Sequence, residues 1–457
     1  MHAEGASSDL LAMMAGVREV EAALSDRARI QAMLDVEAAL AEAEAALGVI
    51  PAAAAAPIRS AARGQDYPLR ELADQASSAG NLLIPLLSRF RQTVAASSPE
   101  AAGFVHWGAT SQDIIDTALA LQLRAALSVL LDDTDRAARA AARHARQHAT
   151  TVMAGRTWLQ QATPVTFGLK AAGWLDAILS AAKRVRASRD AVLVLQFGGA
   201  SGTLAALGGQ GPAVARELAS RLDLALPPLP WHAQRIRVAA LAADLGILTG
   251  AFGKIAQDLS LLAQSEIAEA FDAPEAAGGS STMPHKRNPV RASIVQACAL
   301  RAPGLVATML GAMPQEHERG PAGWQAEWDV LPDLVRTSAS AARATAALLE
   351  GLVVDAGRMR QNLEQAGGVT MAEAVVMRLA GALGPADARQ AVEAAVKRAA
   401  AEPRPFAEIL AADPRVSAVL DREAIDRALA PEHYLGSSGQ FIQAVLEAYE
   451  REEHTES

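Results

Sequence analysis

Cysteine is almost absent from this chain of 457 residues, which contains only Cys298. A single cysteine excludes an internal disulfide framework and any cysteine-rich zinc or iron–sulfur site. Aromatic residues are also scarce, at 4 % of the chain, whereas alanine is abundant throughout. Because alanine is the best helix former and a poor strand former, this composition argues against a β-sandwich or a β-barrel.

Two further absences concern location and partners. The first 13 residues are too polar for a signal peptide, and the longest apolar run, about residues 238–252, is interrupted by Asp244. That run is shorter than the ~20 residues that span a bilayer. The net charge of −9 argues against nonspecific nucleic-acid binding but permits a local cationic pocket for an anionic substrate. We therefore expect a cytoplasmic protein that binds neither nucleic acid nor a membrane.

Helical periodicity dominates the chain, and we find no clear alternating strand segment and no repeat of fixed period. Helices are predicted at about residues 26–47, 113–148, 235–271, 289–313 and 329–352. We predict an all-α protein with an N-terminal helical domain (1–109), a central bundle of long helices (110–353) and a C-terminal helical domain (354–457). Helices this long need partners along their whole length, so we also expect an oligomer.

Several side chains on these helices receive a structural interpretation. The first helix has an apolar side, and its charge comes from Arg29, Asp35, Glu37, Glu42 and Glu44. Gly246, Gly250 and Gly253 share one helix face, which predicts close approach of a neighbouring helix. His144 and His148 have the i, i+4 spacing of a metal-binding pair, but Arg143 and Arg146 favour a solvated face. The glycine-rich residues 197–203 lack a P-loop ending and predict a connector near the site.

The segment with the strongest chemical signal lies between two predicted helices. Its sequence is Gly278-Gly279-Ser280-Ser281-Thr282-Met283-Pro284-His285-Lys286-Arg287-Asn288-Pro289. Asn288 is suited to cap the next helix and Pro289 to begin it. Two hydroxyls, basic side chains and a helix N-terminus within twelve residues predict an anion-binding site.

Two more segments carry polar side chains just before predicted helices. The first is His106-Trp107-Gly108-Ala109-Thr110-Ser111-Gln112-Asp113, in which Thr110 and Asp113 fit a capping box. The second is Gly155-Arg156-Thr157-Trp158-Leu159-Gln160-Gln161-Ala162-Thr163-Pro164, which we interpret as a polar turn. Taken alone, neither segment specifies a function.

Together these three segments resemble the fumarase/aspartase superfamily. Residues 279–289 match its signature loop G-S-S-x-M-P-x-K-x-N-P, and residues 110–113 and 157–160 resemble its other two blocks. Within the superfamily, the chain is most similar to the bacterial 3-carboxy-cis,cis-muconate cycloisomerases. His317-Glu318-Arg319 and residues 324–328 support this resemblance, while residues 367–374 resemble the C-terminal domain of adenylosuccinate lyases.

The resemblance implies an enzyme that needs no cofactor and no metal. Its substrate would be a small tricarboxylate of protocatechuate catabolism, which it would convert to a carboxymuconolactone. It also implies a homotetramer with active sites shared between subunits. By resemblance, Ser280 transfers the proton and His106 is an acid/base candidate. The binding residues implied are Thr110, Ser111, Gln160, Lys286, Asn288 and Arg287. Arg287 and His285 either recognise the third carboxylate or pair with acidic residues of the fold.

One position departs from the pattern of the superfamily, and it distinguishes a cycloisomerase from a fumarate-releasing lyase. Most superfamily lyases have histidine where this chain has Trp158. A departing amine or hydroxide needs a proton donor, whereas a carboxylate, with a pKa of ~4, does not. Trp158 therefore favours a cycloisomerase over the alternative, a fumarate-releasing lyase similar to adenylosuccinate lyase. A non-catalytic structural relative is the other alternative, although Ser280, Lys286 and Asn288 are all present.

Overall fold

A computed structural model describes residues 15–273, 283 and 286–456 of the chain. The protein is predominantly helical, as the composition predicts. It forms two compact units, each assembled from three stretches of chain. Unit 1 comprises Met1–Asp135, Ser180–Gly253 and Ile294–Ala344, and unit 2 comprises Arg136–Leu179, Lys254–Ser293 and Thr345–Ser457.

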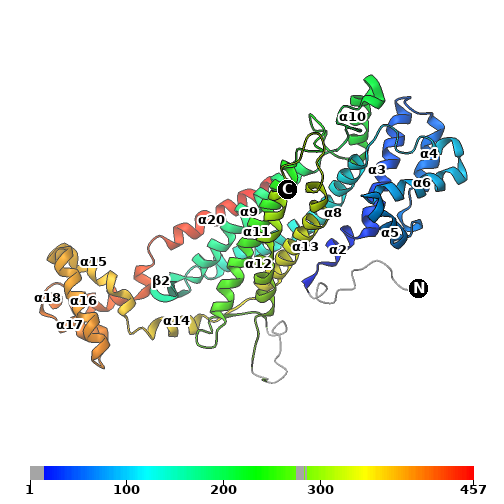
Figure 1. Cartoon of the computed structure of the whole chain (residues 1–457). Helices are drawn as coiled ribbons and strands as arrows, with labels where there is room; N and C mark the ends of the chain where they lie inside the picture. The colour runs from blue at the N-terminus through cyan, green and yellow to red at the C-terminus, as the bar shows by residue number, and fades with distance from the viewer. Residues whose placement is uncertain (1–14, 274–282, 284–285, 457) are drawn as a thin grey trace. The chain divides into compact units, whose positions relative to one another are not determined.

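The N-terminal part of unit 1 is a group of helices in which α2, α4 and η1 contact α3, and α6 and α7 contact α4 (Figure 1). Its elements are α2 (Arg18–Ala23), α3 (Asp26–Ala46), α4 (Ala52–Ala61), η1 (Gly64–Asp66), α5 (Leu69–Ala79), α6 (Leu83–Ser97) and α7 (Pro99–Ala102). The predicted helix at 26–47 is confirmed, because Ser25 accepts a hydrogen bond from Ala28 N at its start and Gly48 follows its end with φ +68°.

Longer helices follow, and these pass through both units. They are α8 (Ser111–Gln147), α9 (Phe167–Val192), α11 (Ile236–Leu262), α12 (Val290–Gly311) and α13 (Gly323–Glu350), with η2 (Ala205–Gln210) and α10 (Gly211–Leu222) between α9 and α11. The acidic run 132–135 does not interrupt α8. The predicted helix at 235–271 is too long, because α11 ends at Leu262 and residues 270–271 form a strand.

Glycines on α11 let other helices of unit 1 approach closely, as predicted. A Cβ placed on Gly246 would lie 2.6 Å from Val306 Cγ2, and one on Gly253 would lie 2.6 Å from Ala299 Cβ. Both neighbours belong to α12, whereas a Cβ on Gly250 would meet nothing within 4 Å. Two of the three glycines are therefore required by packing.

The sequence shows no clear alternating strand segment, yet unit 2 contains two short strand pairs. β1 (Val152–Thr157) and β2 (Gln160–Thr166) form an antiparallel hairpin, and β3 (Ala270–Phe271) pairs with β4 (Val353–Val354). The hairpin pairs Thr157 with Gln160 and has a register shift between Ala154 and Arg156. Because of this register shift, apolar and polar residues do not alternate regularly along the hairpin, and that alternation is the sequence pattern that predicts strands.

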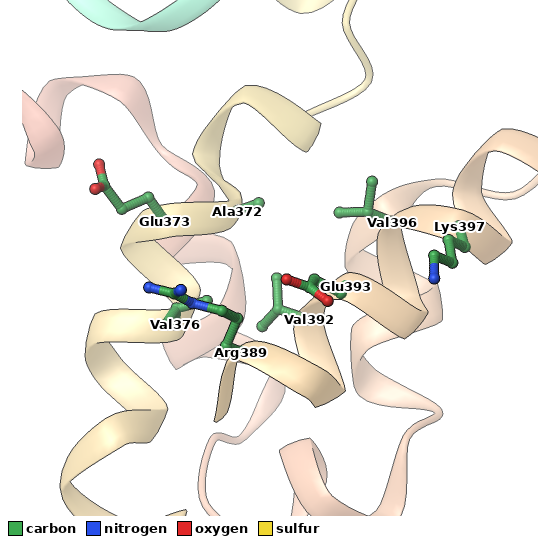
Figure 2. Close-up of a pocket in the computed structure, with 8 residues that line it drawn as sticks. All are labelled: Ala372, Glu373, Val376, Arg389, Val392, Glu393, Val396 and Lys397. Atoms are coloured by element: carbon green, nitrogen blue, oxygen red, sulfur yellow. The ribbon is translucent and has the colours of Figure 1, made fainter. Parts of the chain in front are cut away.

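The C-terminal part of unit 2 has a hydrophobic core of its own, built on α15, α16, α17 and α19 (Figure 1). Its elements are α14 (Ala356–Glu364), η4 (Val369–Met371), α15 (Ala372–Leu383), α16 (Pro385–Ala401), α17 (Phe406–Ala411), α18 (Pro414–Ser417), α19 (Arg422–Leu429), η5 (Pro431–Tyr434) and α20 (Ser438–Glu456). A groove of about 450 Å³ lies between α15 and α16 (Figure 2). None of the predicted site residues lines this groove.

The assignment of His144 and His148 to a solvated face is wrong. Both are buried in unit 2, where their rings stack 5.9 Å apart and each meets the edge of Phe167. His144 Nε2 lies 2.8 Å from the carbonyl oxygen of Leu349, so Nε2 carries the proton of the neutral ring. Burial lowers the pKa of both histidines below the usual value of about 6.5.

Because of these lowered pKa values, we expect the pair to destabilise the fold in acid. Below about pH 6.5 the unfolded chain takes up protons that the folded chain resists, so stability falls with decreasing pH by at most about 1.4 kcal/mol per pH unit for each histidine. Above about pH 7 both states are neutral and the effect vanishes. The check is the urea midpoint at pH 7.5 and 5.5 for the wild type and for the double variant H144Q/H148Q. The difference between the two proteins should change with pH, and a constant difference would contradict the prediction.

Candidate functional site

The carboxylate of Asp113 fixes the beginning of α8 in unit 1. Its Oδ2 accepts hydrogen bonds from Thr110 N at 3.0 Å and Gly199 N at 2.9 Å. Its Oδ1 accepts from Gly198 N at 2.9 Å and is 2.7 Å from His232 Nε2. The bond from Thr110 N is one of the two bonds of the predicted capping box. In it, the side chain of Asp113, the third residue of the helix, accepts from the backbone N–H of the capping residue. The bonds to the two glycines confirm that the glycine-rich connector lies beside this block.

Thr110 and Ser111 lie at the exposed end of this arrangement. Both are half-buried, and Ser111 is the first residue of α8. Neither hydroxyl is hydrogen-bonded to any residue in the described part of the chain. The first turn of a helix also has backbone N–H groups without partners inside the helix, and its dipole favours an anion. This end of α8 therefore offers two hydroxyl groups, free N–H donors and a favourable dipole to an anion.

One turn further along α8, a buried ionic network supports this end. Arg235 is fully buried and donates to Asp116 Oδ2 at 2.7 Å and to Glu327 Oε1 at 3.0 Å. Burial opposes the positive charge of Arg235, but Asp116 and Glu327 together hold its pKa above the usual value. Trp324 Nε1 donates to Asp116 Oδ1 at 2.9 Å. We call Asp116, Arg235, Glu327 and Trp324 the Arg235 network.

Arg319 connects the loop before α13 to the same region. Its Nε donates to Gln112 Oε1 at 2.9 Å, and its Nη1 donates to the carbonyl oxygen of Ala200 at 3.1 Å. Gln112 Nε2 in turn donates to Asp116 Oδ2 at 3.2 Å. The residues around 317–328, which the sequence offered only as support for a resemblance, thus pack beneath the beginning of α8.

His106 lies in the loop that leads into α8. Its Nδ1 is 2.6 Å from Oε1 of Glu37, which belongs to α3. The backbone of His106 has φ +66°, a left-handed conformation that is uncommon for a residue with a side chain. Glu37 and Glu44, which the sequence counts among the charged residues of their helix, are both buried.

Gln160 belongs to the hairpin of unit 2, which ends in two exposed apolar residues. Trp158 and Leu159 are 97 % and 76 % exposed, and both have positive φ, +52° and +63°. Positive φ at both loop residues is the geometry of a type I′ turn, which normally takes asparagine or glycine. A left-handed backbone at residues other than glycine persists only where the surrounding structure enforces it. The interpretation of this segment as a simple polar turn is therefore wrong.

A buried ionic contact anchors the hairpin to the rest of unit 2. Arg156 donates to both carboxylate oxygens of Glu269, at 2.9 and 2.7 Å, and Glu269 is fully buried. Asn362 Nδ2 adds a bond to Glu269 at 2.8 Å, and Gln161 Nε2 donates to the carbonyl oxygen of Asn362 at 3.0 Å. The tip is thus exposed while its base is held.

The signature segment belongs to unit 2 and is described in part. Ser280 and His285 lie outside the described residues. Lys286 and Arg287 are exposed and Asn288 is half-buried, immediately before α12. α12 begins at Val290, and Ser293 N donates to the carbonyl oxygen of Pro289 at 2.9 Å, so the predicted helix start is shifted by one residue.

The structure therefore divides the predicted site residues between the two units. His106, Thr110 and Ser111 belong to unit 1. Gln160, Lys286, Arg287 and Asn288 belong to unit 2. In the described part of the chain, no group of three or more histidine, cysteine, aspartate or glutamate side chains could hold a metal ion.

The sequence did not reveal that Glu37 contacts His106, or that Trp324 and Glu327 join Arg235 and Asp116 in one network. A signal for Glu37 was present, because it shares a helical stripe with the buried Met33 and Leu40. Arg235 carried no comparable signal, since its two carboxylate partners are 119 and 92 residues away in the sequence.

Comparisons with known proteins cover almost the whole chain. The family described as Lyase matches residues 16–304, and the family described as adenylosuccinate lyase C-terminus matches residues 368–445. A 3-carboxy-cis,cis-muconate cycloisomerase of Bradyrhizobium diazoefficiens is 50 % identical over 98 % of this chain and 99 % of that protein. A nitrosuccinate lyase of Streptomyces davaonensis is 40 % identical over 96 % of this chain and 94 % of its own length. The crystal structure of the 3-carboxy-cis,cis-muconate lactonizing enzyme of Pseudomonas putida matches with a TM-score of 0.92, at 44 % identity, over 97 % of this chain and 99 % of that one.

Proposed function

This chain belongs to the lyase family within the fumarase/aspartase superfamily, and from that membership and the site geometry we infer that it is an enzyme that cyclises 3-carboxy-cis,cis-muconate. The observation that carries this proposal is the identity of 50 % to a cycloisomerase over 98 % of the chain. The anion-binding end of α8 fits a substrate with several carboxylates. The enzyme would serve the protocatechuate branch of aromatic catabolism.

The reaction rearranges the substrate without oxidation or reduction. One carboxylate oxygen forms a C–O bond to a carbon of the conjugated diene, and a proton adds to the neighbouring carbon. That carbon lies next to another carboxylate, which takes up the negative charge that develops before protonation. The carboxylate that closes the ring loses its negative charge as it becomes an ester, and the neighbouring carbon gains a proton. The trianion therefore becomes a dianionic lactone with the uptake of one proton and no other co-reactant. Fixed cations and N–H groups would stabilise the developing charge.

In this proposal the residues of unit 1 bind one end of the substrate. Thr110 and Ser111 would hold a carboxylate through their hydroxyls and the free N–H groups of α8. Asp113 keeps these groups in place, because it binds the backbone of Thr110 and of the glycine-rich connector. His106 would act as an acid/base or as a ligand of a carboxylate.

In the proposed site, which subunits share, the residues of unit 2 would come from another copy of the chain, bind the other carboxylates and move the proton. Lys286 and Asn288 would take one carboxylate, and Arg287 would add positive charge nearby. Gln160 would donate a hydrogen bond from the hairpin. Ser280 would transfer the proton, acting as a base in the reverse direction.

Trp158 favours this reaction over elimination of an amine or hydroxide. It occupies the hairpin tip next to Gln160, where most superfamily lyases have histidine. The indole can neither donate a proton to a leaving group nor accept one, so a poor leaving group would go unassisted. A carboxylate is a good leaving group and does not need that help.

For the assembly we propose a homotetramer in the cytoplasm, with active sites shared between subunits. By length and composition, α8, α11 and α12 could each cross a membrane. Each contains an apolar stretch of 18 residues, and this stretch is 61 % buried within the protein in α8 and 56 % buried in α11. The corresponding stretch of α12 is only 22 % buried, and Leu300 on this helix is 83 % exposed. A second copy of the chain would cover this apolar surface of α12, as it would the hairpin tip.

The replacement L300E should therefore dissociate the assembly. Sedimentation velocity in buffer without detergent should show a tetramer for the wild type and smaller species for the variant, because a carboxylate buried at a subunit interface is unpaired. An exposed position on α20, in the variant Q443E, provides the control. A wild type that stays monodisperse only in detergent would favour a membrane protein, and a monomeric wild type with full activity would refute the shared site.

An ultraviolet assay with 3-carboxy-cis,cis-muconate tests the function. Cyclisation destroys the conjugated diene, so absorbance should fall when purified enzyme is added without any cofactor. The same enzyme should release no fumarate from adenylosuccinate or argininosuccinate. Constant absorbance together with rapid cleavage of either compound would replace the proposal with the fumarate-releasing lyase.

A further inference from the structure

The buried carboxylate of Glu37 is in direct contact with the ring of His106. Glu37 is 2 % exposed, and its Oε1 lies 2.6 Å from His106 Nδ1. An ionised carboxylate can only accept a hydrogen bond, so Nδ1 must carry the proton in this contact. In the neutral ring, Nε2 then keeps its lone pair. The His106 side chain remains 12 % exposed, so the ring is not sealed inside the core.

The backbone around His106 requires such a contact to hold its conformation. A left-handed φ at a residue other than glycine costs about 1–3 kcal/mol and persists only where the surroundings enforce it. Arg91 Nη2 donates to the carbonyl oxygen of Val105 at 3.1 Å and so fixes the residue before His106. Glu37 fixes the ring itself from a different element, α3.

We propose that Glu37 is a positioning residue that orients His106 for the reaction, with Nδ1–H bound to the carboxylate and Nε2 presented to the substrate. The kinetic part of this inference rests on the proposed function. A carboxylate on Nδ1 fixes the tautomer and the ring plane, and it stabilises the imidazolium that forms when Nε2 takes up a proton. Glu37 thus acts through His106 and does not itself touch the substrate.

Glu44 supplies a matched control on the same helix. It is fully buried two turns from Glu37, and neither of its carboxyl oxygens has a hydrogen-bond partner in the described part of the chain. Burial, and then the negative charge of Glu37, raise the pKa of Glu44 to about 8. It is therefore mostly uncharged at neutral pH, and a glutamine there preserves both size and charge.

The kinetic experiment compares E37Q, E44Q and H106N alone and in combination. We expect E37Q to lower kcat about 10-fold or more, the size typical of such supporting contacts, with KM changed less than about 3-fold. E44Q should leave kcat unchanged. In the H106N background, E37Q should lower kcat by no more than about 2-fold, because the histidine through which Glu37 acts is absent. A full kcat in E37Q, or an equal loss in the H106N background, would overturn the proposal.

Nitrogen NMR of the enzyme labelled in its histidine rings provides a readout that needs no substrate. The wild type should show the Nδ1–H tautomer at the signal that H106N removes. E37Q should shift that signal or mix its tautomers, and E44Q should not. If the spectra show these expected results while 3-carboxy-cis,cis-muconate is not turned over, the proposed function fails and the contact between Glu37 and His106 is supported. If turnover is normal and E37Q leaves the signal unchanged, only the role of Glu37 fails.

Discussion

Replacing Ser280 with alanine should abolish turnover of 3-carboxy-cis,cis-muconate while leaving the fold intact. A positioned proton-transfer group contributes about 10²–10⁴-fold to a rate, so kcat should fall by about 10³-fold. KM should change little, because the carboxylates would still be bound by Thr110, Ser111 and Lys286. The measurement is the fall in absorbance of the diene, with circular dichroism and the thermal midpoint as checks of folding.

The adjacent serine makes the experiment specific. S281A removes a hydroxyl of the same kind one residue along the signature loop and should reduce kcat far less than S280A. A near-normal kcat in S280A with wild-type stability would show that another group moves the proton. Equal large losses in both variants would mean that the loop needs its hydroxyls for substrate binding or for its own conformation.

Of the substitutions proposed for this protein, replacing Arg235 with methionine should lower the free energy of unfolding the most. The guanidinium is fully buried between Asp116 and Glu327, so its removal leaves two carboxylates buried without a counter-charge. Breaking a buried pair in this way costs about 3–5 kcal/mol. The thermal and urea midpoints should both fall, and KM should rise as well, because Asp116 is one turn from the carboxylate-binding end of α8.

A second variant separates loss of charge balance from loss of packing. E327Q keeps the shape of the side chain and leaves Arg235 paired with Asp116 alone, so its destabilisation should be clearly smaller than that of R235M. A loss of less than about 1 kcal/mol in R235M, or a larger one in E327Q, would show that the network does not hold α8 in place.

The sequence predicted the helical class because alanine and apolar periodicity are local properties. The helix at 26–47 matches α3 closely, since Ser25 and Gly48 give it readable ends. The hairpin at residues 152–166 was missed because its pairing is irregular and its tip carries Trp158 and Leu159 instead of turn residues. Turn propensity cannot predict a conformation that the local sequence disfavours.

By itself, the sequence determined the family and the chemical groups of the candidate site, because these depend on which residues follow one another. The signature loop, the block ending in Asp113 and Trp158 all belong to that information. Only the tertiary structure decided which side chains support them. Glu37 reaches His106 across 69 residues, and Arg235 reaches Asp116 across 119. The structure also buries His144 and His148, which were expected on a solvated face, and it buries Glu37 and Glu44. Whether a helix face meets water or another helix depends on the neighbours that the fold supplies.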